Sequence, residues 1–263
     1  MNDCEQFYHL SLADFVDEKY IKTNGIYVHP KIKDLTRPIY RYIQIEHLLS
    51  MLDREELYIP NRKRFKDKAE HGHKFNPKNT FPLTIVSKNY SKNGRKLDNT
   101  YEKWVSAYNL CISCWTYDVQ QTDNSDYIAE NYLMWKSYGE NSVCCRIETT
   151  ISELIQSIED INIDILISDV SYVKEHLSDN IAQHYIFEKS IYYRDEKEIR
   201  LCVLKTADAV CLKIDPFRMI KHIILSPFIG NNLSDLIIGH LKTAYPNWNI
   251  PIEKSHIMEN INL

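Results

Sequence analysis

Glycine and proline are scarce in this sequence, with 6 and 9 residues respectively among 263. Flexible linkers are rich in such residues, so the composition argues against a long linker between domains. No apolar run approaches the roughly 18 residues of a membrane-spanning helix. The first residues, Met1 to Glu5, have neither the basic nor the apolar stretch of a secretory leader. We therefore expect a single cytoplasmic domain over residues 1–263 that has no membrane partner.

Several catalytic motifs are also missing. The sequence contains no Walker loop, no G-x-G-x-x-G, no G-x-S-x-G and no H-E-x-x-H. Its seven cysteines are an odd number, and four of them lie in apolar runs that predict buried, reduced thiols: Cys111, Cys144, Cys202 and Cys211. Cys111 and Cys114 form a C-x-x-C, but an extended strand turns them to opposite faces, so we predict no metal site.

Acidic residues are rare in one segment, although the chain has a net charge of -4. Residues 61–97 hold eleven Lys or Arg against two acids, with Phe and Tyr interleaved. Cationic side chains bind phosphates and aromatic rings stack on bases, so this basic insertion predicts a nucleic-acid contact through Lys63, Arg64 and Lys66. The alternative is a solvated loop with no ligand.

Hydrophobic periodicity predicts a mixed order of strands and helices. Strands are expected at 38–43, 57–60, 108–117, 142–148, 163–173, 193–204, 210–214, 222–226 and 250–252. Helices are expected at 45–52, 132–138 (with a cap at Asp126), 150–159, 180–190 and 232–243. Because strands and helices do not alternate strictly, we expect an α+β fold rather than a doubly wound parallel sheet.

The predicted strand 193–204 organises the functional interpretation. Alternation places Glu196, Glu198 and Arg200 on one face and apolar residues on the other. Such a charged face either is solvated or lines a site. In the strand 38–43, Arg41 shares a face with two isoleucines, and a charge in that position needs a carboxylate or an incoming anion.

Five short motifs follow one another along the chain. They are Tyr40-Arg41-Tyr42, Phe65-Lys66-Asp67, Ile112-Ser113-Cys114, Leu133-Met134-Trp135 with Tyr138, and Glu196-Lys197-Glu198 with Arg200. This series is similar to a large bacterial family of uncharacterised function. The order of an arginine strand, a serine strand and a Glu-x-Glu strand also resembles the arginine-serine-glutamate signature of ADP-ribosyltransferases.

The second resemblance implies an ADP-ribosyltransferase-like domain of mixed sheets with flanking helices that takes NAD as substrate. Arg41, next to Tyr42, would hold the NAD phosphates or ribose, and Ser113 would support the nicotinamide ribose. Glu198 would be the catalytic glutamate, and Glu196 would help to engage the acceptor. The nicotinamide ring is cationic, so Trp115 or Tyr117 is expected to offer it an aromatic face, unless these rings only pack. Cys114-Trp115 departs from the Thr-Ser that usually follows the first serine.

Three functions fit these features. The first is transfer of ADP-ribose from NAD to nucleic acid or protein by a toxin or phage-defence effector, for which a neutralising antitoxin partner is expected. The second is a non-catalytic nucleic-acid-binding or interaction module on the same scaffold. The third is a metal-dependent nuclease, ranked last because its carboxylates come from two distant segments: Asp67, Glu70, Glu196 and Glu198.

Overall fold

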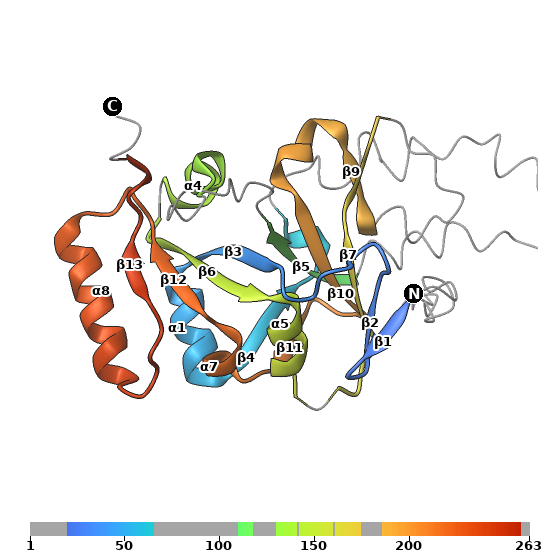
Figure 1. The fold of residues 1–263 in the computed structure, drawn as a ribbon, viewed down its shortest axis with the longest axis horizontal. Coiled ribbons are helices and arrows are strands. Elements are labelled where there is room, and N and C mark those ends of the chain that lie inside the picture. The colour runs from blue at the N-terminus through green and yellow to red at the C-terminus, as the bar shows by residue number, and fades with distance from the viewer. Residues whose placement is uncertain are drawn as a thin grey trace, which may run out of the picture.

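The computed structural model describes residues 20–65, 110–117, 130–140, 142–159, 161–174 and 186–258. Within them, a nine-stranded sheet has the order β1-β2-β7-β10-β5-β3-β6-β12-β13 (Figure 1). Neighbours in it are antiparallel except for the parallel pairs β2–β7 and β12–β13. The strands in this order are Ile21–Thr23, Ile26–Val28, Ile165–Asp169, Glu198–Thr206, Leu110–Thr116, Pro38–Gln44, Cys144–Thr150, His222–Leu225 and Ile252–Lys254.

Two smaller sheets and several helices complete the described fold. The small sheets are β4 (Glu56–Pro60) with β11 (Ala209–Lys213), and β8 (Ser171–Val173) with β9 (Glu188–Ser190). The α-helices are α1 (Ile45–Arg54), α4 (Tyr132–Gly139), α5 (Ile151–Ser157), α7 (Pro216–Met219) and α8 (Asn231–Ala244). The 3-10 helices are η2 (Arg62–Arg64) and η4 (Ile191–Glu196). This confirms the predicted α+β class.

One face of the large sheet, called face A here, carries the main hydrophobic core. Ile39, Ile147 and Ile199 lie on it and belong to one buried cluster with side chains of α1, α5, α7, β4 and β11. Figure 1 shows these helices and the β4–β11 sheet together on one side of the large sheet. Face A is therefore mostly closed by packed apolar side chains.

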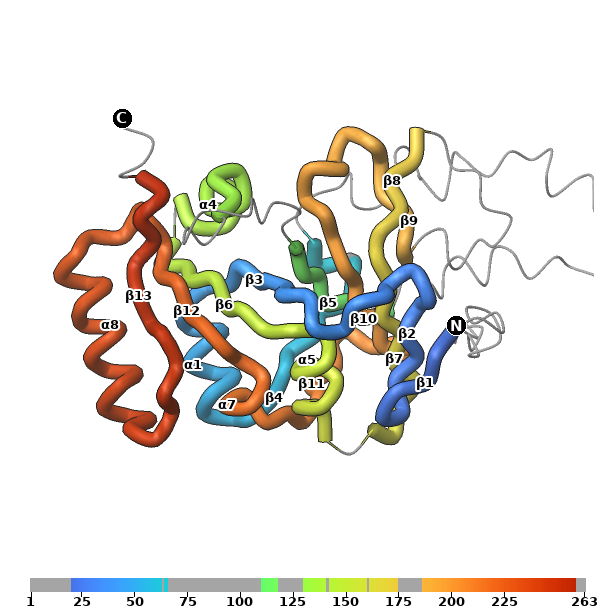
Figure 2. Tube along the Cα trace, viewed as in Figure 1, coloured from blue at the N-terminus to red at the C-terminus, as the bar shows by residue number. Residues whose placement is uncertain are grey.

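The other face, called face B, is covered by different elements. Helix α4 packs on β3 and β6, where Tyr42 and Trp135 form a small core. Figure 1 shows α4 and the segment from β9 to η4 on the same side of the sheet, over its two halves. Between them lie β3, β5 and β10, three strands that come from distant parts of the chain and run next to one another (Figure 2).

The most instructive disagreement with the sequence concerns the expected strand 193–204. Residues 191–196 form the 3-10 helix η4, and Lys197 then adopts the left-handed backbone conformation with φ 45°. The strand therefore begins only at Glu198, and Glu196 is not part of it. The helix expected at 180–190 agrees with the helical residues 186–187 but is wrong at 188–190, because these residues form strand β9 and pair with β8. Residues 180–185 and Asp126 lie outside the described residues.

Helix α4 begins where its own sequence provides a cap. The Asn131 side chain accepts hydrogen bonds from the backbone N–H groups of Leu133 and Met134. Asparagine at this position satisfies donors that the first helical turn leaves without intrahelical partners. The cap and the burial of Trp135 together fix the helix over β3.

The described cysteines are all free. Cys111, Cys144 and Cys202 are buried, as predicted, but Cys211 is exposed. The burial prediction fails at Cys211 because β11 pairs only with β4 and turns this residue to the open side of their sheet. Cys111 belongs to the face A core while Cys114 packs with residues of face B, so the two lie on opposite faces as alternation predicts.

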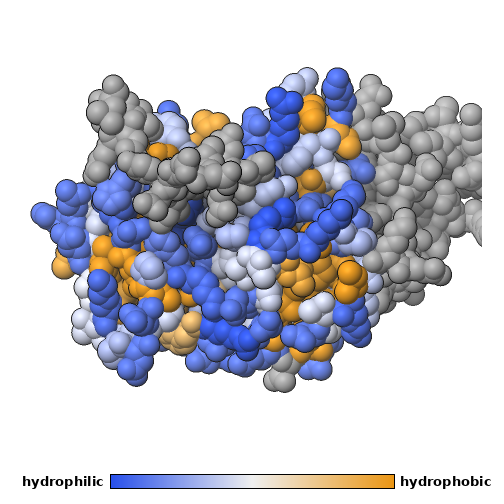
Figure 3. All heavy atoms as spheres, in the orientation of Figure 1, coloured by the Kyte–Doolittle hydropathy of each residue, from blue (hydrophilic) through white to orange (hydrophobic). Residues whose placement is uncertain are grey.

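The outer surface of the described residues is mixed in polarity. Figure 3 shows mainly hydrophilic residues with hydrophobic areas at the α8 end and at the β1–β2 end of the molecule. Leu236 on α8 and Ile21 on β1 are among the exposed large apolar side chains. None of the helices in the described ranges is long and apolar enough to cross a membrane.

Candidate functional site

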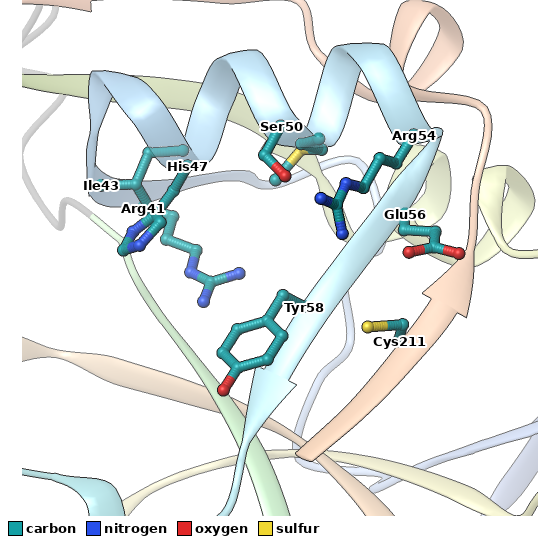
Figure 4. A pocket seen from close by; sticks show the side chains of 9 residues that line it. Arg41, Ile43, His47, Ser50, Arg54, Glu56, Tyr58 and Cys211 are labelled. Carbon is teal, nitrogen blue, oxygen red and sulfur yellow. The ribbon is translucent and has the colours of Figure 1, made fainter.

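A pocket of about 300 Å³ opens between α1 and the β4–β11 sheet (Figure 4). Arg41 reaches it from β3 and Arg54 from the last turn of α1, and both side chains point into the space (Figure 4). The full lining consists of Arg41, Ile43, His47, Ser50, Met51, Arg54, Glu56, Tyr58 and Cys211. Three of these are basic residue types and one is acidic, so the pocket suits an anion.

Arg41 occupies the position that strand alternation predicts. Its neighbours Ile39 and Ile43 are buried in the face A core, and Arg41 itself is half-buried at the border of that core. Its guanidinium carbon lies 5.9 Å from the centre of the Trp115 ring. Burial lowers the pKa of the Arg41 guanidinium, whereas Cys114 and Tyr138 raise it. No carboxylate of the described part of the chain pairs with it.

Strands β3 and β5 separate beside Arg41. They share a single paired position, Tyr40 opposite Thr116, whereas β3 pairs with β6 on its other edge over all of Pro38–Gln44. Cys114 lies two residues from Thr116 on the face B side of β5, yet it influences the pKa of Arg41. Arg41 is therefore within electrostatic range of Cys114, a face B side chain, although the pocket that Arg41 lines is on face A.

Glu198 lies on face B at the start of β10, in the centre of a buried charge cluster. Its Oε1 accepts a hydrogen bond from Arg200 Nε at 2.7 Å, and its Oε2 accepts one from Arg200 Nη2 at 3.1 Å. Lys189 Nζ lies 3.4 Å from Oε2. The Cys114 thiol also bonds the carboxylate. Burial raises the pKa of Glu198, but Arg200 and Lys189 outweigh it and lower the pKa to about 2.

Glu196 joins this cluster from η4 rather than from the strand. Lys189 Nζ lies 2.6 Å from Glu196 Oε2, so one ammonium group links both glutamates of the Glu-x-Glu motif. Lys189 is buried at 4% exposure, and its charge also lies 4.8 Å from the centre of the Tyr193 ring. The like charges of the motif are thus neutralised by a lysine and an arginine of the chain itself.

Ser113 does not meet Glu198. The register places Ser113 opposite Leu201, and both point to face A, whereas Cys114 is opposite Arg200 on face B. The Ser113 hydroxyl is fully buried and accepts a hydrogen bond from Trp115 Nε1 at 3.0 Å. Ser113 and Trp115 therefore bond to each other in the core of face A. The side chain of this strand that lies beside Glu198 is the Cys114 thiol.

Tyr117 and Tyr42, the remaining aromatic candidates, have contacts of their own. The Arg37 guanidinium lies 3.9 Å from the centre of the Tyr117 ring and is paired with Asp169. Tyr42 is buried and contacts Trp135 edge to face, with ring centres 4.8 Å apart. The Tyr138 ring also stacks on the Tyr42 ring. Tyr42 is thus a core residue of face B, whereas Tyr138 is half exposed.

The basic insertion is described only at its beginning. Lys66 lies outside the described residues, and Lys63 contributes its backbone to η2. Arg64 is exposed, and its Nη1 donates a hydrogen bond to Tyr58 Oη at 3.0 Å. Arg64 therefore lies at the side of the pocket that Tyr58 lines, and nucleic-acid binding through these residues stays a prediction.

Three residues of this region were missed by the sequence interpretation. Arg54 ends an amphipathic helix, Lys189 precedes the Glu-x-Glu motif, and the Tyr172 hydroxyl accepts a hydrogen bond from the Glu198 backbone N–H at 2.9 Å. Only Lys189 left a usable signal, because two nearby glutamates require a cation. Among the described residues, no group of three or more His, Cys, Asp or Glu could hold a metal ion.

The sequence matches no protein-family model and no curated protein.

Proposed function

We propose that this chain is an ADP-ribosyltransferase-like effector, acting in the bacterial cytoplasm as a toxin or in phage defence. NAD is the substrate, and the acceptor of ADP-ribose is a nucleic acid or a protein. The supporting observation is the adjacency of β10, β5 and β3, the three neighbouring strands that carry an ionised Glu198, the Cys114 thiol and Arg41 with its pocket. The resemblance of the motifs to ADP-ribosyltransferases supports the same function.

The reaction breaks the bond between the nicotinamide nitrogen and ribose C1′. The bonding electron pair leaves with nicotinamide, so positive charge develops on the sugar. A carboxylate fixed beside the sugar stabilises this transition state more than the ground state, which is the role proposed for Glu198. The acceptor's oxygen or nitrogen then bonds to C1′ and its proton passes to water. Glu196, which is 35% exposed, is the residue proposed to bind that acceptor.

The cluster around Glu198 sets a condition for this role. Both carboxylate oxygens are bonded to Arg200, at 2.7 and 3.1 Å, and the contact to Lys189 is longer, at 3.4 Å. Lys189 is held more closely by Glu196, so its distance from Glu198 can grow without leaving the ammonium unpaired. A bound ribose hydroxyl would replace Lys189 as the third partner of Glu198.

The buried Glu198–Arg200 pair also supports a second candidate function. A glutamate with 4% exposure and two bonds to a buried arginine is also what a purely structural ion pair looks like. In that case the chain is a non-catalytic nucleic-acid-binding or interaction module. The interleaved cations and aromatic residues of 61–97 favour nucleic acid as its partner.

NAD labelled on the adenine ribose separates the two candidates. The protein is incubated with it and with RNA, DNA or a protein extract, and both nicotinamide release and labelled acceptor are measured. Transferase activity predicts release of nicotinamide together with a labelled macromolecule. Intact NAD in every mixture would leave only the binding module.

A further inference from the structure

We infer that the pocket beneath α1 binds the diphosphate group of a nucleotide between Arg41 and Arg54. The inference deepens the proposed function, because NAD contains such a group, and it rests on that proposal for the identity of the natural ligand. Binding itself requires no chemistry at Glu198, which does not line the pocket. Arg54 is the new element, since neither the motifs nor the resemblance pointed to it.

The guanidinium groups of Arg41 and Arg54 are available to bind an anion. Arg37 is paired with Asp169, Arg200 with Glu198 and Arg218 with Glu153. In contrast, no carboxylate within the described residues pairs with Arg41 or Arg54. Arg41 is half-buried, and a guanidinium in such a position without a counter-ion is costly, so a bound anion would stabilise the Arg41 side of the pocket.

The two guanidinium groups enter the pocket from different directions. Arg41 comes from β3 and Arg54 from the end of α1, and Figure 4 shows their guanidinium groups entering the pocket from two separate points of its wall. Two forks that approach from separate points match an anion with several oxygens spread over two phosphorus atoms better than a single carboxylate. His47 and Ser50 line the same helix side and add further hydrogen-bonding groups.

The wall of the pocket opposite α1 is formed by Glu56, Tyr58 and Cys211. Tyr58 and Cys211 are paired positions of β4 and β11, and Arg64 bonds the Tyr58 hydroxyl. The Tyr58 side chain is 43% exposed, which leaves ring surface for a planar base. Glu56 can accept a hydrogen bond from a hydroxyl or amino group. The volume of about 300 Å³ lies at the lower end of the range for small-molecule sites.

Calorimetric titration with ADP, AMP and inorganic pyrophosphate tests the inference. ADP is expected to bind about tenfold more tightly than AMP, because AMP lacks one of the two groups that the arginines bind. Arg54→Gln is the main variant, since Arg54 is exposed and its replacement is expected to leave the melting temperature unchanged. It should weaken ADP binding about tenfold, and Arg41→Lys should weaken it similarly at an unchanged melting temperature.

The matched control is Arg218→Gln, which removes an exposed arginine of α7 that is paired with Glu153. It should leave ADP binding unchanged. The inference is overturned if ADP fails to bind at millimolar concentration, or if Arg54→Gln and Arg218→Gln bind it equally well. Measuring ADP binding and NAD turnover in the wild type and in Glu198→Gln separates this result from the proposed function. If ADP binds but no protein turns over NAD, the pocket is retained as a nucleotide site and the transferase function is rejected.

Discussion

The Glu198 carboxylate and the Arg200 guanidinium form a two-point ion pair within a single strand, with both residues almost fully buried. They are two positions apart on β10 and therefore project from the same face of the sheet. Arg200 also donates from Nη1 to the Ile186 carbonyl oxygen at 2.7 Å. The pair thus ties the beginning of β10 to the segment that covers face B, and any function of Glu198 depends on Arg200.

Arg200→Leu should destabilise the fold strongly. The substitution leaves the Glu198 charge buried without its main partner and removes the bond to Ile186, which together should cost about 3–5 kcal/mol. The double variant Glu198→Leu, Arg200→Leu removes both charges and should be more stable than Arg200→Leu alone. Urea denaturation of the three proteins measures this, and a double variant less stable than the single one would contradict the ion-pair account.

The stability of the fold should depend on pH through Glu198. Its pKa in the folded chain is about 2, below the ordinary value of 4.5, so its contribution is complete above about pH 4.5 and is lost as the pH falls toward 2. The difference in unfolding free energy between the wild type and Glu198→Gln should therefore shrink from pH 6 to pH 3. A difference that stays constant over this range would show that the carboxylate charge is not stabilised.

Ser113→Ala tests whether the serine of the motif has a structural or a ligand-binding role. The variant leaves the Trp115 Nε1–H buried without its partner and should cost about 1–3 kcal/mol. Because Ser113 faces the core, the KM for NAD should not change. A raised KM for NAD at little loss of stability would instead restore the ribose contact that the resemblance implies.

Cys114→Ser replaces the thiol beside Glu198 by a hydroxyl, the group that the Thr of the transferase signature has after the first serine. The hydroxyl can donate to the same carboxylate, and a hydroxyl is the stronger donor. If Glu198 is catalytic, NAD turnover in this variant should equal or exceed that of the wild type. Cys114→Ala, which removes the bond, serves as the matched comparison and should lower turnover.

The basic insertion should confer salt-dependent binding to RNA. Neutralising Lys63, Arg64 and Lys66 together removes up to three phosphate contacts, so the slope of log K against log salt should become shallower by about 2 for a single strand. Fluorescence anisotropy with a labelled oligonucleotide at several salt concentrations measures this slope. Equal slopes for the variant and the wild type would exclude these three residues as phosphate contacts.

Much of the fold could be predicted because its signals are local. The strand at Arg41 and the helix that follows it have clear periodicities, and both agree with β3 and α1. The start of β10 could not be predicted, because the alternation of Glu196, Glu198 and Arg200 continues in the sequence through the turn at Lys197. A residue pattern shows the periodicity of side chains along a strand or helix, whereas the left-handed turn at Lys197 depends on tertiary contacts.

The site was harder to predict than the fold. Arg41 could be selected because a charge between two core isoleucines needs an anion, and the structure places it in a pocket. Ser113 was selected by resemblance, yet the register of β5 against β10 turns its neighbour Cys114 toward Glu198. A shift of one residue reverses the face of a side chain, and sequence alone does not fix that register.

Nicotinamide release from NAD by Glu198→Gln, compared with the wild type, tests the central claim most directly. Glu159→Gln, which changes an exposed glutamate outside the cluster, is the control. The account predicts turnover in the wild type and in the control, and a loss of about a hundredfold or more in Glu198→Gln at retained ADP binding. Equal release by all three proteins would contradict a catalytic role for Glu198.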